Sequence, residues 1–155
     1  MPARSLTSHL SDPEATCALA AAIGQRLRAG DVLLLGGSIG AGKTHFARCL
    51  IQSLLHEPED VPSPTYTLVQ VYDTRHGPLW HADLYRLSGI DEIVELGLVD
   101  AFDTAICLVE WPDRLDGLAP DSALRLDFSV TGEETRDVTL NWSHPRWDGV
   151  PELAA

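Results

Sequence analysis

A glycine-rich run ending in a lysine and a threonine has the residue types and spacing most suggestive of chemistry. Residues 37–44 read Gly-Ser-Ile-Gly-Ala-Gly-Lys-Thr and fit the pattern G-x-x-x-x-G-K-[ST] at every fixed position. Glycines let backbone N–H groups approach phosphate oxygens, and a helix that begins there adds its positive dipole end. We expect Lys43, the single lysine of the chain, to reach the outer phosphates of a nucleotide and the Thr44 hydroxyl to bind Mg²⁺.

Two acidic residues could complete a magnesium site beside this phosphate loop, as residues 37–44 are called below. Glu110 follows the apolar run at residues 105–109, and Asp83 ends the less apolar run at residues 79–82. A carboxylate at the end of a neighbouring strand commonly binds the cation directly or through water. Spacing alone leaves open which acid binds the metal and which orients the attacking water.

Three further segments have either a functional or a purely structural interpretation. Residues 63–65, Ser-Pro-Thr, could form a loop that senses the γ-phosphate, or a turn stiffened by proline. His81 could contact phosphate or a metal-bound water, or could be a hydrogen-bonded structural histidine. Trp111 could pack near the nucleotide or bury the end of its strand.

The elements that must position these residues follow from hydrophobic periodicity and from turn residues. We expect an edge strand within residues 1–10, a helix capped by Ser11 and ended by Gly30, and a strand at residues 31–35 that is buried on both faces. A helix at 44–55 and strands at 66–72, 79–83 and 105–110 should follow, with a short helix at 91–96 closed by Gly97.

The C-terminal part alternates apolar and polar residues in two runs. Residues 124–130 and 135–142 predict an antiparallel hairpin. The expected fold class is therefore α/β, with a mixed sheet of the P-loop NTPase type flanked by helices in a single domain. We expect this domain to span residues 1–142, and residues 143–155 to form a loosely ordered tail.

Composition narrows the classes of partner and compartment. The 155-residue chain carries a formal net charge of -12, which disfavours direct binding to nucleic acid. Its apolar runs are shorter than a membrane span, and its start lacks the apolar core of a signal peptide. Cys17, Cys49 and Cys107 are odd in number and far apart, which predicts buried, reduced thiols in a cytoplasmic protein and neither a disulfide framework nor a zinc site.

Taken together, these segments resemble the bacterial TsaE (YjeE) family, the P-loop ATPase of tRNA threonylcarbamoyladenosine biosynthesis. They occur in the family's order over about residues 11–137, and those outside the phosphate loop are the more specific ones. The matching segments are Gly40-Ala41-Gly42-Lys43-Thr44, Ser63-Pro64-Thr65-Tyr66-Thr67-Leu68-Val69, His81-Ala82-Asp83-Leu84-Tyr85-Arg86-Leu87, Glu95-Leu96-Gly97 and Glu110-Trp111-Pro112.

The resemblance implies roles for several residues. Thr44 and Glu110 would bind Mg²⁺, Asp83 would lie beside the γ-phosphate, and residues 63–65 would form a switch-like loop. The helix around Thr16 and the hairpin near Arg136 would lie toward the base. The nucleotide-binding residues would be Gly37, Ser38, Ile39, Gly40, Ala41, Gly42, Lys43, Thr44, His45, Trp111 and Arg136, and the catalytic ones Asp83, Lys43 and Thr65.

The resemblance also implies ATP and Mg²⁺ as cofactors and a TsaB–TsaD heterodimer as partner. ATP turnover on that pair would support repeated rounds of tRNA modification, with tRNA reached only through the partners and no membrane involved. The family usually reads G-D-L-G-A-G-K-T-T in the loop, whereas Ser38 replaces the aspartate and His45 the second threonine here. Binding should survive both changes, but a role of the second threonine's hydroxyl would be lost.

Two other classes share the phosphate loop. A small-molecule kinase usually needs a lid that carries several arginines, and no arginine-rich segment is visible. A GTPase would need an N-K-x-D segment to recognise the base, and the chain has none. A binding module that uses nucleotide only as a conformational switch, with negligible turnover, remains a third interpretation.

Overall fold

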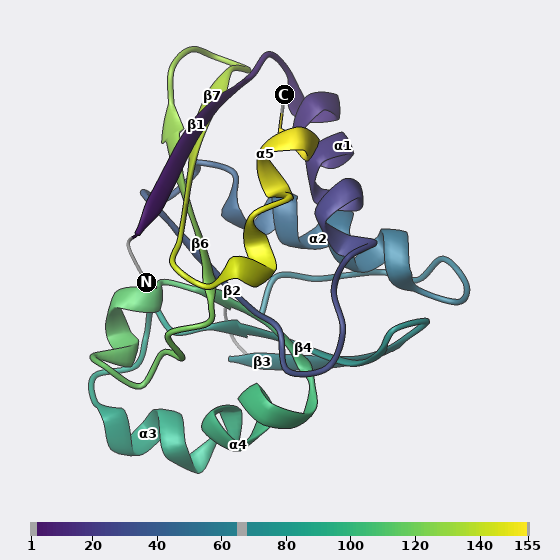
Figure 1. Ribbon diagram of the computed structural model, residues 1–155. Coiled ribbons are helices and arrows are strands. Elements are labelled where there is room, and N and C mark those ends of the chain that lie inside the picture. Colours follow the sequence, from purple (N-terminus) through teal and green to yellow (C-terminus); the bar gives the residue numbers. More distant parts are fainter. Residues whose placement is uncertain (1–2, 65–67, 155) are drawn as a thin grey trace.

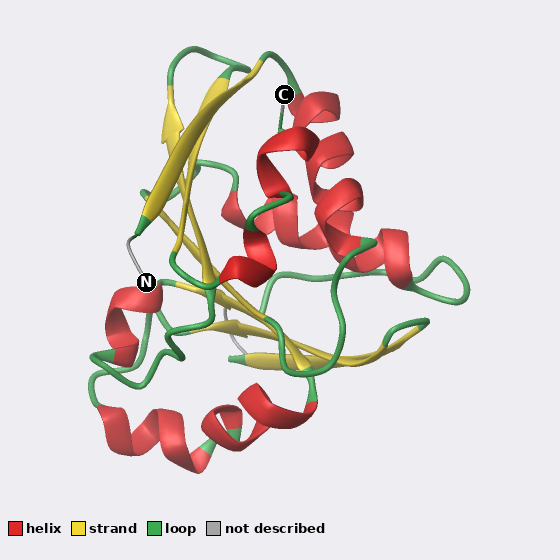
Figure 2. Cartoon of the chain, viewed as in Figure 1, coloured by secondary structure: helices red, strands yellow, loops and turns green. Residues whose placement is uncertain are grey.

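A mixed β-sheet runs through the molecule and carries helices on both faces (Figures 1 and 2). The computed structural model describes residues 3–64 and 68–154. Within these residues the seven-stranded sheet has the order β1-β7-β6-β2-β5-β4-β3. Its strands are β1 (Arg4–Leu10), β2 (Val32–Gly37), β3 (Val69–Thr74), β4 (Gly77–Asp83), β5 (Ile106–Glu110), β6 (Leu124–Val130) and β7 (Arg136–Trp142).

The central strands are parallel, and the strands outside them are antiparallel. β2 pairs in parallel with both β5 and β6, and β4 pairs in parallel with β5. The pairs β1–β7, β6–β7 and β3–β4 are antiparallel. The predicted α/β class, mixed sheet, N-terminal edge strand and C-terminal hairpin are thus confirmed.

Helices on the two faces of the sheet enclose two separate hydrophobic cores. One face is covered by α1 (Pro13–Gly24), α2 (Lys43–Leu54) and α5 (Val150–Leu153), and the other by α3 (Ile90–Glu95) and α4 (Leu98–Thr104) (Figure 1). Leu33 and Leu35 of β2 point into the first core, whereas Val32 and Leu34 point into the second. This alternation confirms the prediction that the strand before the phosphate loop is buried on both faces.

Two local predictions are wrong, and one helix was not predicted. Asp12, not Ser11, caps α1, because its carboxylate accepts a hydrogen bond from the Ala15 N–H at 2.7 Å. The helix ends at Gly24 and not at Gly30, because the chain leaves the helix there and makes turns at residues 25–26 and 29–30. Gly97 closes α3 as expected but also begins α4, a helix that the sequence did not predict.

The C-terminal segment packs against the protein, contrary to the loose tail expected from its prolines and glycine. Trp147, in the 3-10 helix η2 (Pro145–Trp147), is 1% exposed, and its Nε1–H donates to the carbonyl of Ser122 at 2.7 Å. Arg146 forms an ion pair with Asp31 at the start of β2. Trp147 and Val150 therefore anchor the segment to the first core.

None of the helices in the described ranges is both long and apolar enough to span a lipid bilayer.

Candidate active site

Parallel pairing brings the predicted site residues to one edge of the sheet. The phosphate loop follows β2, Asp83 ends β4 and Glu110 ends β5, and these strands run in the same direction. Asp83 and Glu110 are paired residues of adjacent strands. The turn between β6 and β7 emerges at the same edge, because β6 is parallel to β2.

The phosphate loop passes from β2 into α2 as the motif requires. Gly37, Gly40 and Gly42 have φ angles of 128°, 80° and 109°, which a residue with a side chain rarely adopts. Gly37 is also sterically confined, because a Cβ there would lie 2.5 Å from the carbonyl oxygen of Phe128 on β6. Ala41 is buried, whereas Ile39 is 74% exposed at the tip of the loop.

Glu110 is the centre of a buried hydrogen-bond network that links the loop to β4. Its Oε1 accepts a hydrogen bond from Thr44 Oγ1 at 2.7 Å, and its Oε2 lies 2.7 Å from His81 Nε2. Glu110 is 2% exposed and His81 is fully buried. Because an ionised carboxylate can only accept, Nε2 of His81 carries the hydrogen, so the histidine fixes the orientation of the acid.

The Thr44–Glu110 pair has the character of a magnesium site. Both ligands are oxygens, which Mg²⁺ prefers, and two oxygens that share an octahedral Mg²⁺ at 2.0–2.1 Å lie about 2.9 Å apart. The observed separation of 2.7 Å is close to that value. The residues present therefore fit the cation that the phosphate loop implies.

Lys43 lies between the loop, the carboxylates and an aromatic ring. Its Nζ donates to the Gly37 carbonyl at 2.5 Å and lies 3.4 Å from the centroid of the Trp111 ring. Burial lowers the pKa of the Lys43 ammonium, and the charges of Glu110 and then Asp83 oppose this by raising it. Trp111 is thus adjacent to Lys43 and packs, partly buried, against the second core at the end of β5, whereas its proximity to a nucleotide stays a prediction.

Asp83 is buried and its carboxylate orientation is fixed by the backbone. Its Oδ1 accepts a hydrogen bond from the Tyr85 N–H at 3.0 Å, and its own N–H donates to the Leu68 carbonyl at 2.9 Å. Thr65 belongs to the segment 65–67, which precedes Leu68. Its predicted catalytic role therefore lies outside the described residues.

A pocket of about 480 Å³ opens on the other side of the loop, between α1 and the β6–β7 turn. Arg136 reaches the loop from β7, with its Nη2 3.4 Å from the Gly40 carbonyl. The two residues expected near the base, Thr16 and Arg136, both line this pocket, as do two acids of the turn that the sequence did not single out. The lining residues are Pro13, Thr16, Gly40, Gly42, Lys43, Thr44, His45, Glu133, Glu134 and Arg136.

The cysteines differ from the expectation of three buried thiols. Cys17 of α1 and Cys49 of α2 are joined in a disulfide, while Cys107 is free and buried on β5. The pairing arises because α1 and α2 pack side by side. Cys17 and Cys49 are 32 positions apart in the sequence, but their Cα atoms lie only 5.1 Å apart. Burial raises the pKa of the Cys107 thiol to about 12, so only that thiol has the inert environment predicted for all three.

Comparison with known proteins identifies the family. The family model for "Threonylcarbamoyl adenosine biosynthesis protein TsaE" matches residues 10–138. The chain is 36% identical over 127 residues to the tRNA threonylcarbamoyladenosine biosynthesis protein TsaE of Rickettsia felis, covering 82% of this chain and 74% of that one. It is also 36% identical over 142 residues to the protein of that name from Bacillus subtilis, covering 91% and 88% of the two chains.

A solved structure agrees with the sequence matches. The crystal structure of Bacillus subtilis YdiB superimposes with a TM-score of 0.76 at 28% identity and covers 98% of this chain and 95% of that one. The fold, the order of the motifs and the matches over most of the chain all point to one family. The chain therefore belongs to the TsaE family of tRNA threonylcarbamoyladenosine biosynthesis proteins.

Proposed function

We propose that this protein is a Mg²⁺-dependent ATP-binding protein and slow ATPase that acts on a TsaB–TsaD-like partner complex. In this role it would support formation of N6-threonylcarbamoyladenosine in tRNA. The observation that carries the proposal is the phosphate loop with Thr44 bonded to Glu110 at the edge of the sheet where Asp83 also ends. Family membership supplies the pathway, and the geometry supports the nucleotide chemistry.

The position of each residue in the site suggests its role. Backbone N–H groups of the phosphate loop and Lys43 would bind the phosphates, and Thr44 and Glu110 would hold Mg²⁺, which neutralises phosphate charge when bound. Asp83 is the acid adjacent to Glu110 in the sheet. It would orient the attacking water or accept a proton from it. Trp111 would hold Lys43 by a cation–π contact until the phosphates arrive.

The charge of the molecule supports an indirect relation to RNA. A net charge of -12 repels a phosphate backbone on average, so we infer that tRNA is held by the partner proteins.

The experiment pairs nucleotide-binding and turnover measurements on two variants of the full chain. Lys43→Ala should weaken ATP binding at least about 100-fold, or about 3 kcal/mol, because the loop loses its cation. Asp83→Asn should leave the affinity within about threefold but reduce partner-stimulated turnover at least about 100-fold. Binding is followed by calorimetry and tryptophan fluorescence, and turnover by phosphate release with and without a purified TsaB–TsaD pair.

Arg28→Ala and Asp73→Asn are the matched controls, because they make the same charge changes at exposed positions away from the loop. Both should bind and hydrolyse ATP like the unaltered protein. If Asp83→Asn abolished binding, the assigned division between Asp83 and Glu110 would be wrong. If the partner pair neither bound the protein nor raised turnover, and a small molecule became phosphorylated instead, the protein would be a kinase.

A further inference from the structure

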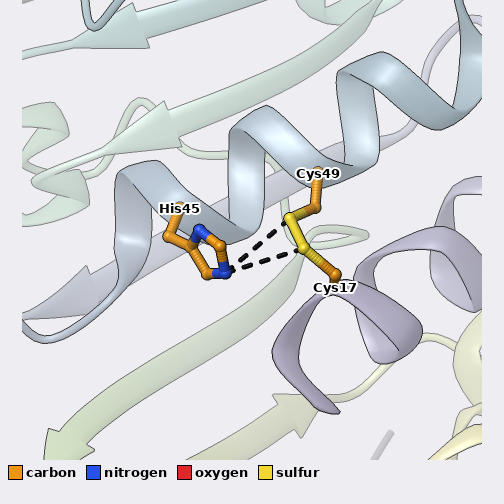
Figure 3. A group of neighbouring side chains, drawn as sticks. All are labelled: Cys17, His45 and Cys49. Carbon is orange, nitrogen blue, oxygen red and sulfur yellow. Dashed lines mark hydrogen bonds between the residues drawn. A yellow bond between two sulfur atoms is a disulfide. The ribbon is translucent and has the colours of Figure 1, made fainter. Parts of the chain in front are cut away.

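Beside the phosphate loop, two sulfur atoms and an imidazole converge between α1 and α2 (Figure 3). Cys17 comes from α1, whereas His45 and Cys49 come from α2. His45 Nε2 lies 3.6 Å from Cys17 Sγ and 3.8 Å from Cys49 Sγ. These three ligand atoms all lie within 4.8 Å of one another, and the side chains are half-buried, so a small ion could reach them from solvent.

We propose that the reduced chain binds a Zn²⁺-class cation through Cys17 Sγ, Cys49 Sγ and His45 Nε2, at a site separate from the magnesium site. Zn²⁺ binds thiolate sulfur at about 2.3 Å and imidazole nitrogen at about 2.0–2.1 Å, so a tetrahedral ion would place the nitrogen and each sulfur about 3.6 Å apart. In the disulfide-bonded form the two nitrogen–sulfur distances already match this spacing, so on reduction only the two sulfurs have to move apart. Three protein ligands leave a fourth position for water.

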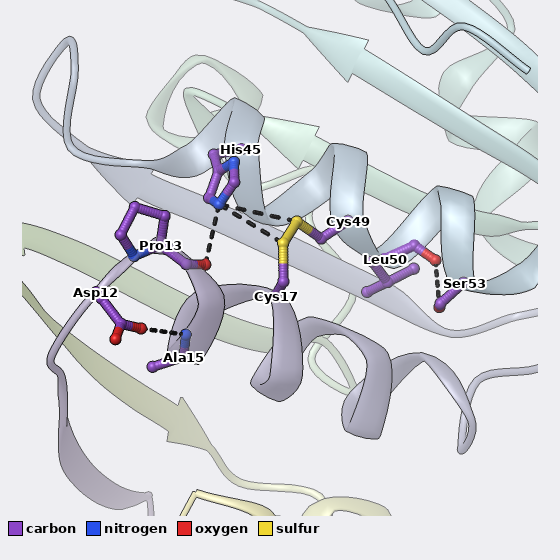
Figure 4. The surroundings of a disulfide bond; sticks show 8 residues. All are labelled: Asp12, Pro13, Ala15, Cys17, His45, Cys49, Leu50 and Ser53. Atoms are coloured by element: carbon purple, nitrogen blue, oxygen red, sulfur yellow. Dashed lines mark hydrogen bonds between the residues drawn. A yellow bond between two sulfur atoms is a disulfide. The ribbon is translucent and has the colours of Figure 1, made fainter. Parts of the chain in front are cut away.

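Local structure explains why the ligands face one another. His45 and Cys49 are four residues apart and therefore share one face of α2. α1 packs closely on that helix, because Gly24 has no side chain where a Cβ would lie 3.2 Å from Ser53 Oγ and 3.3 Å from Leu50 Cγ. The cap of α1 by Asp12 fixes the start of the helix that carries Cys17 (Figure 4). The site is thus held by helix packing that does not depend on the ion.

The disulfide is the oxidised, metal-free form of this site. A dithiol reductant would break the bond between Cys17 and Cys49 and itself become a disulfide, leaving two thiols. Binding of Zn²⁺ would then release both thiol protons to solvent, because the metal ligand is the thiolate. His45 Nε2 lies 3.1 Å from the Pro13 carbonyl, to which it can only donate, so the ring hydrogen must move to Nδ1 before Nε2 can bind the ion.

Ligand chemistry separates this site from the one at Thr44. Two thiolates and an imidazole favour Zn²⁺, whereas the hydroxyl of Thr44 and the carboxylate of Glu110 favour Mg²⁺. The two sites are nonetheless adjacent, since His45 follows Thr44 and lines the same pocket. The proposal stands independently of ATP hydrolysis, because it uses the imidazole of His45 and the two cysteine sulfurs, and the turnover proposed above assigns no step to these side chains.

The test titrates Co²⁺, and then Zn²⁺, into the reduced, metal-stripped full chain without oxygen. We expect one Co²⁺ per chain, with thiolate-to-cobalt charge-transfer absorption and the visible bands of a tetrahedral ion, both removed by Zn²⁺. The magnesium site cannot give this charge-transfer signal, because it has no sulfur. The disulfide form should give none either.

Substitutions assign the ligands. Each of the variants Cys17→Ser, Cys49→Ser and His45→Thr should weaken Zn²⁺ binding at least about 100-fold. Removing even a residue that hydrogen-bonds to a metal ligand lowers metal affinity about 10- to 100-fold, and these residues are the ligands themselves. Cys107→Ala is the matched control and should bind like the unaltered chain, because Cys107 lies in the other core. Circular dichroism of each variant checks that it is folded.

A second measurement needs no variant. In the unaltered reduced chain, Zn²⁺ should slow alkylation of Cys17 and Cys49, and Mg²⁺ should not. The proposal would be overturned by any one of three results: no charge-transfer band, unchanged Zn²⁺ binding in Cys17→Ser, or an alkylation rate that Zn²⁺ does not change.

Discussion

At the scale of single residues, Glu110 joins the elements of the site. It accepts from Thr44 on one oxygen and faces His81 on the other, with both oxygens at 2.7 Å from their partners. A buried carboxylate needs such partners, because an unpaired charge in the interior is strongly destabilising. His81, which could have contacted phosphate, instead orients the acid that we assign to the metal.

Glu110→Gln tests the metal assignment. The neutral amide keeps the size of the side chain but loses the charge that would bind Mg²⁺, so Mg²⁺ should no longer strengthen nucleotide binding. The Mg²⁺-free affinity for ADP should stay within about threefold, because the phosphate loop is unchanged. Calorimetric titration with and without Mg²⁺ checks this. Glu95→Gln, an exposed acid on α3, is the control, and a persistent Mg²⁺ effect in Glu110→Gln would exclude Glu110 as a ligand.

The three cysteines should differ sharply in reactivity. After reduction, Cys17 and Cys49 are half-buried and should react with iodoacetamide in the folded protein, whereas Cys107 should not. Cys107 is fully buried and its pKa is raised to about 12, so only about one thiol in 10⁴ is ionised at pH 8. Mass spectrometry of the labelled sites, folded and unfolded, measures the difference. If Cys107 in the folded protein were labelled as fast as Cys17 and Cys49, the result would contradict the structure.

At the scale of elements, parallel strands determine where the candidate site lies. β2, β4 and β5 end at one edge, so residues far apart in the chain meet there: Thr44 and Glu110 are 66 positions apart. The hairpin of β6 and β7 adds Arg136 to the same edge, and α1 adds Thr16. This agrees with the general rule that open α/β sheets bind ligands at the carboxyl ends of their strands.

Two glycines of the phosphate loop should respond differently to substitution by alanine. Gly37→Ala should destabilise the protein by about 3 kcal/mol or more, because its φ of 128° suits only glycine and its Cβ would meet the Phe128 backbone at 2.5 Å. Gly40→Ala should cost only about 1–2 kcal/mol, because its φ of 80° is left-handed but no atom lies within 4 Å of the Cβ. Urea unfolding measures the stability of both variants. An equal loss of stability in the two would show that the close approach of Gly37 to β6 is unimportant.

At the scale of the whole molecule, the C-terminal segment completes the first core. Trp147 packs there with Val150, and Arg146 pairs with Asp31 next to β2. This segment therefore supports the strand that leads into the phosphate loop, although it lies beyond residues 10–138, which match the family model.

Trp147→Ala tests that support. Removing a buried tryptophan should lower the free energy of unfolding by about 3–5 kcal/mol. Trp147→Phe should lose less, because it keeps most of the packing and loses mainly the hydrogen bond to Ser122. Thermal and urea unfolding compare the two variants. An unchanged stability in Trp147→Ala would show that the segment does not contribute to the core.

Much of the fold could be predicted because its signals are local. The phosphate loop is a contiguous motif, and the alternation in β6 and β7 is visible within each strand. Helix ends were less predictable, because Ser11 and Asp12 are adjacent and both are residue types that favour the cap position. α4 was missed because its short sequence follows a glycine that ordinarily ends a helix.

The sequence by itself determined that the chain has a phosphate loop between a buried strand and a helix, and two strand-end acids beside it. These features depend on residue type and short-range spacing. Only the tertiary structure decided that Glu110 bonds to Thr44 and His81, that Trp111 packs on Lys43, and that Cys17 meets Cys49 beside His45. Such pairings depend on strand order and helix packing, which hydrophobic periodicity does not encode.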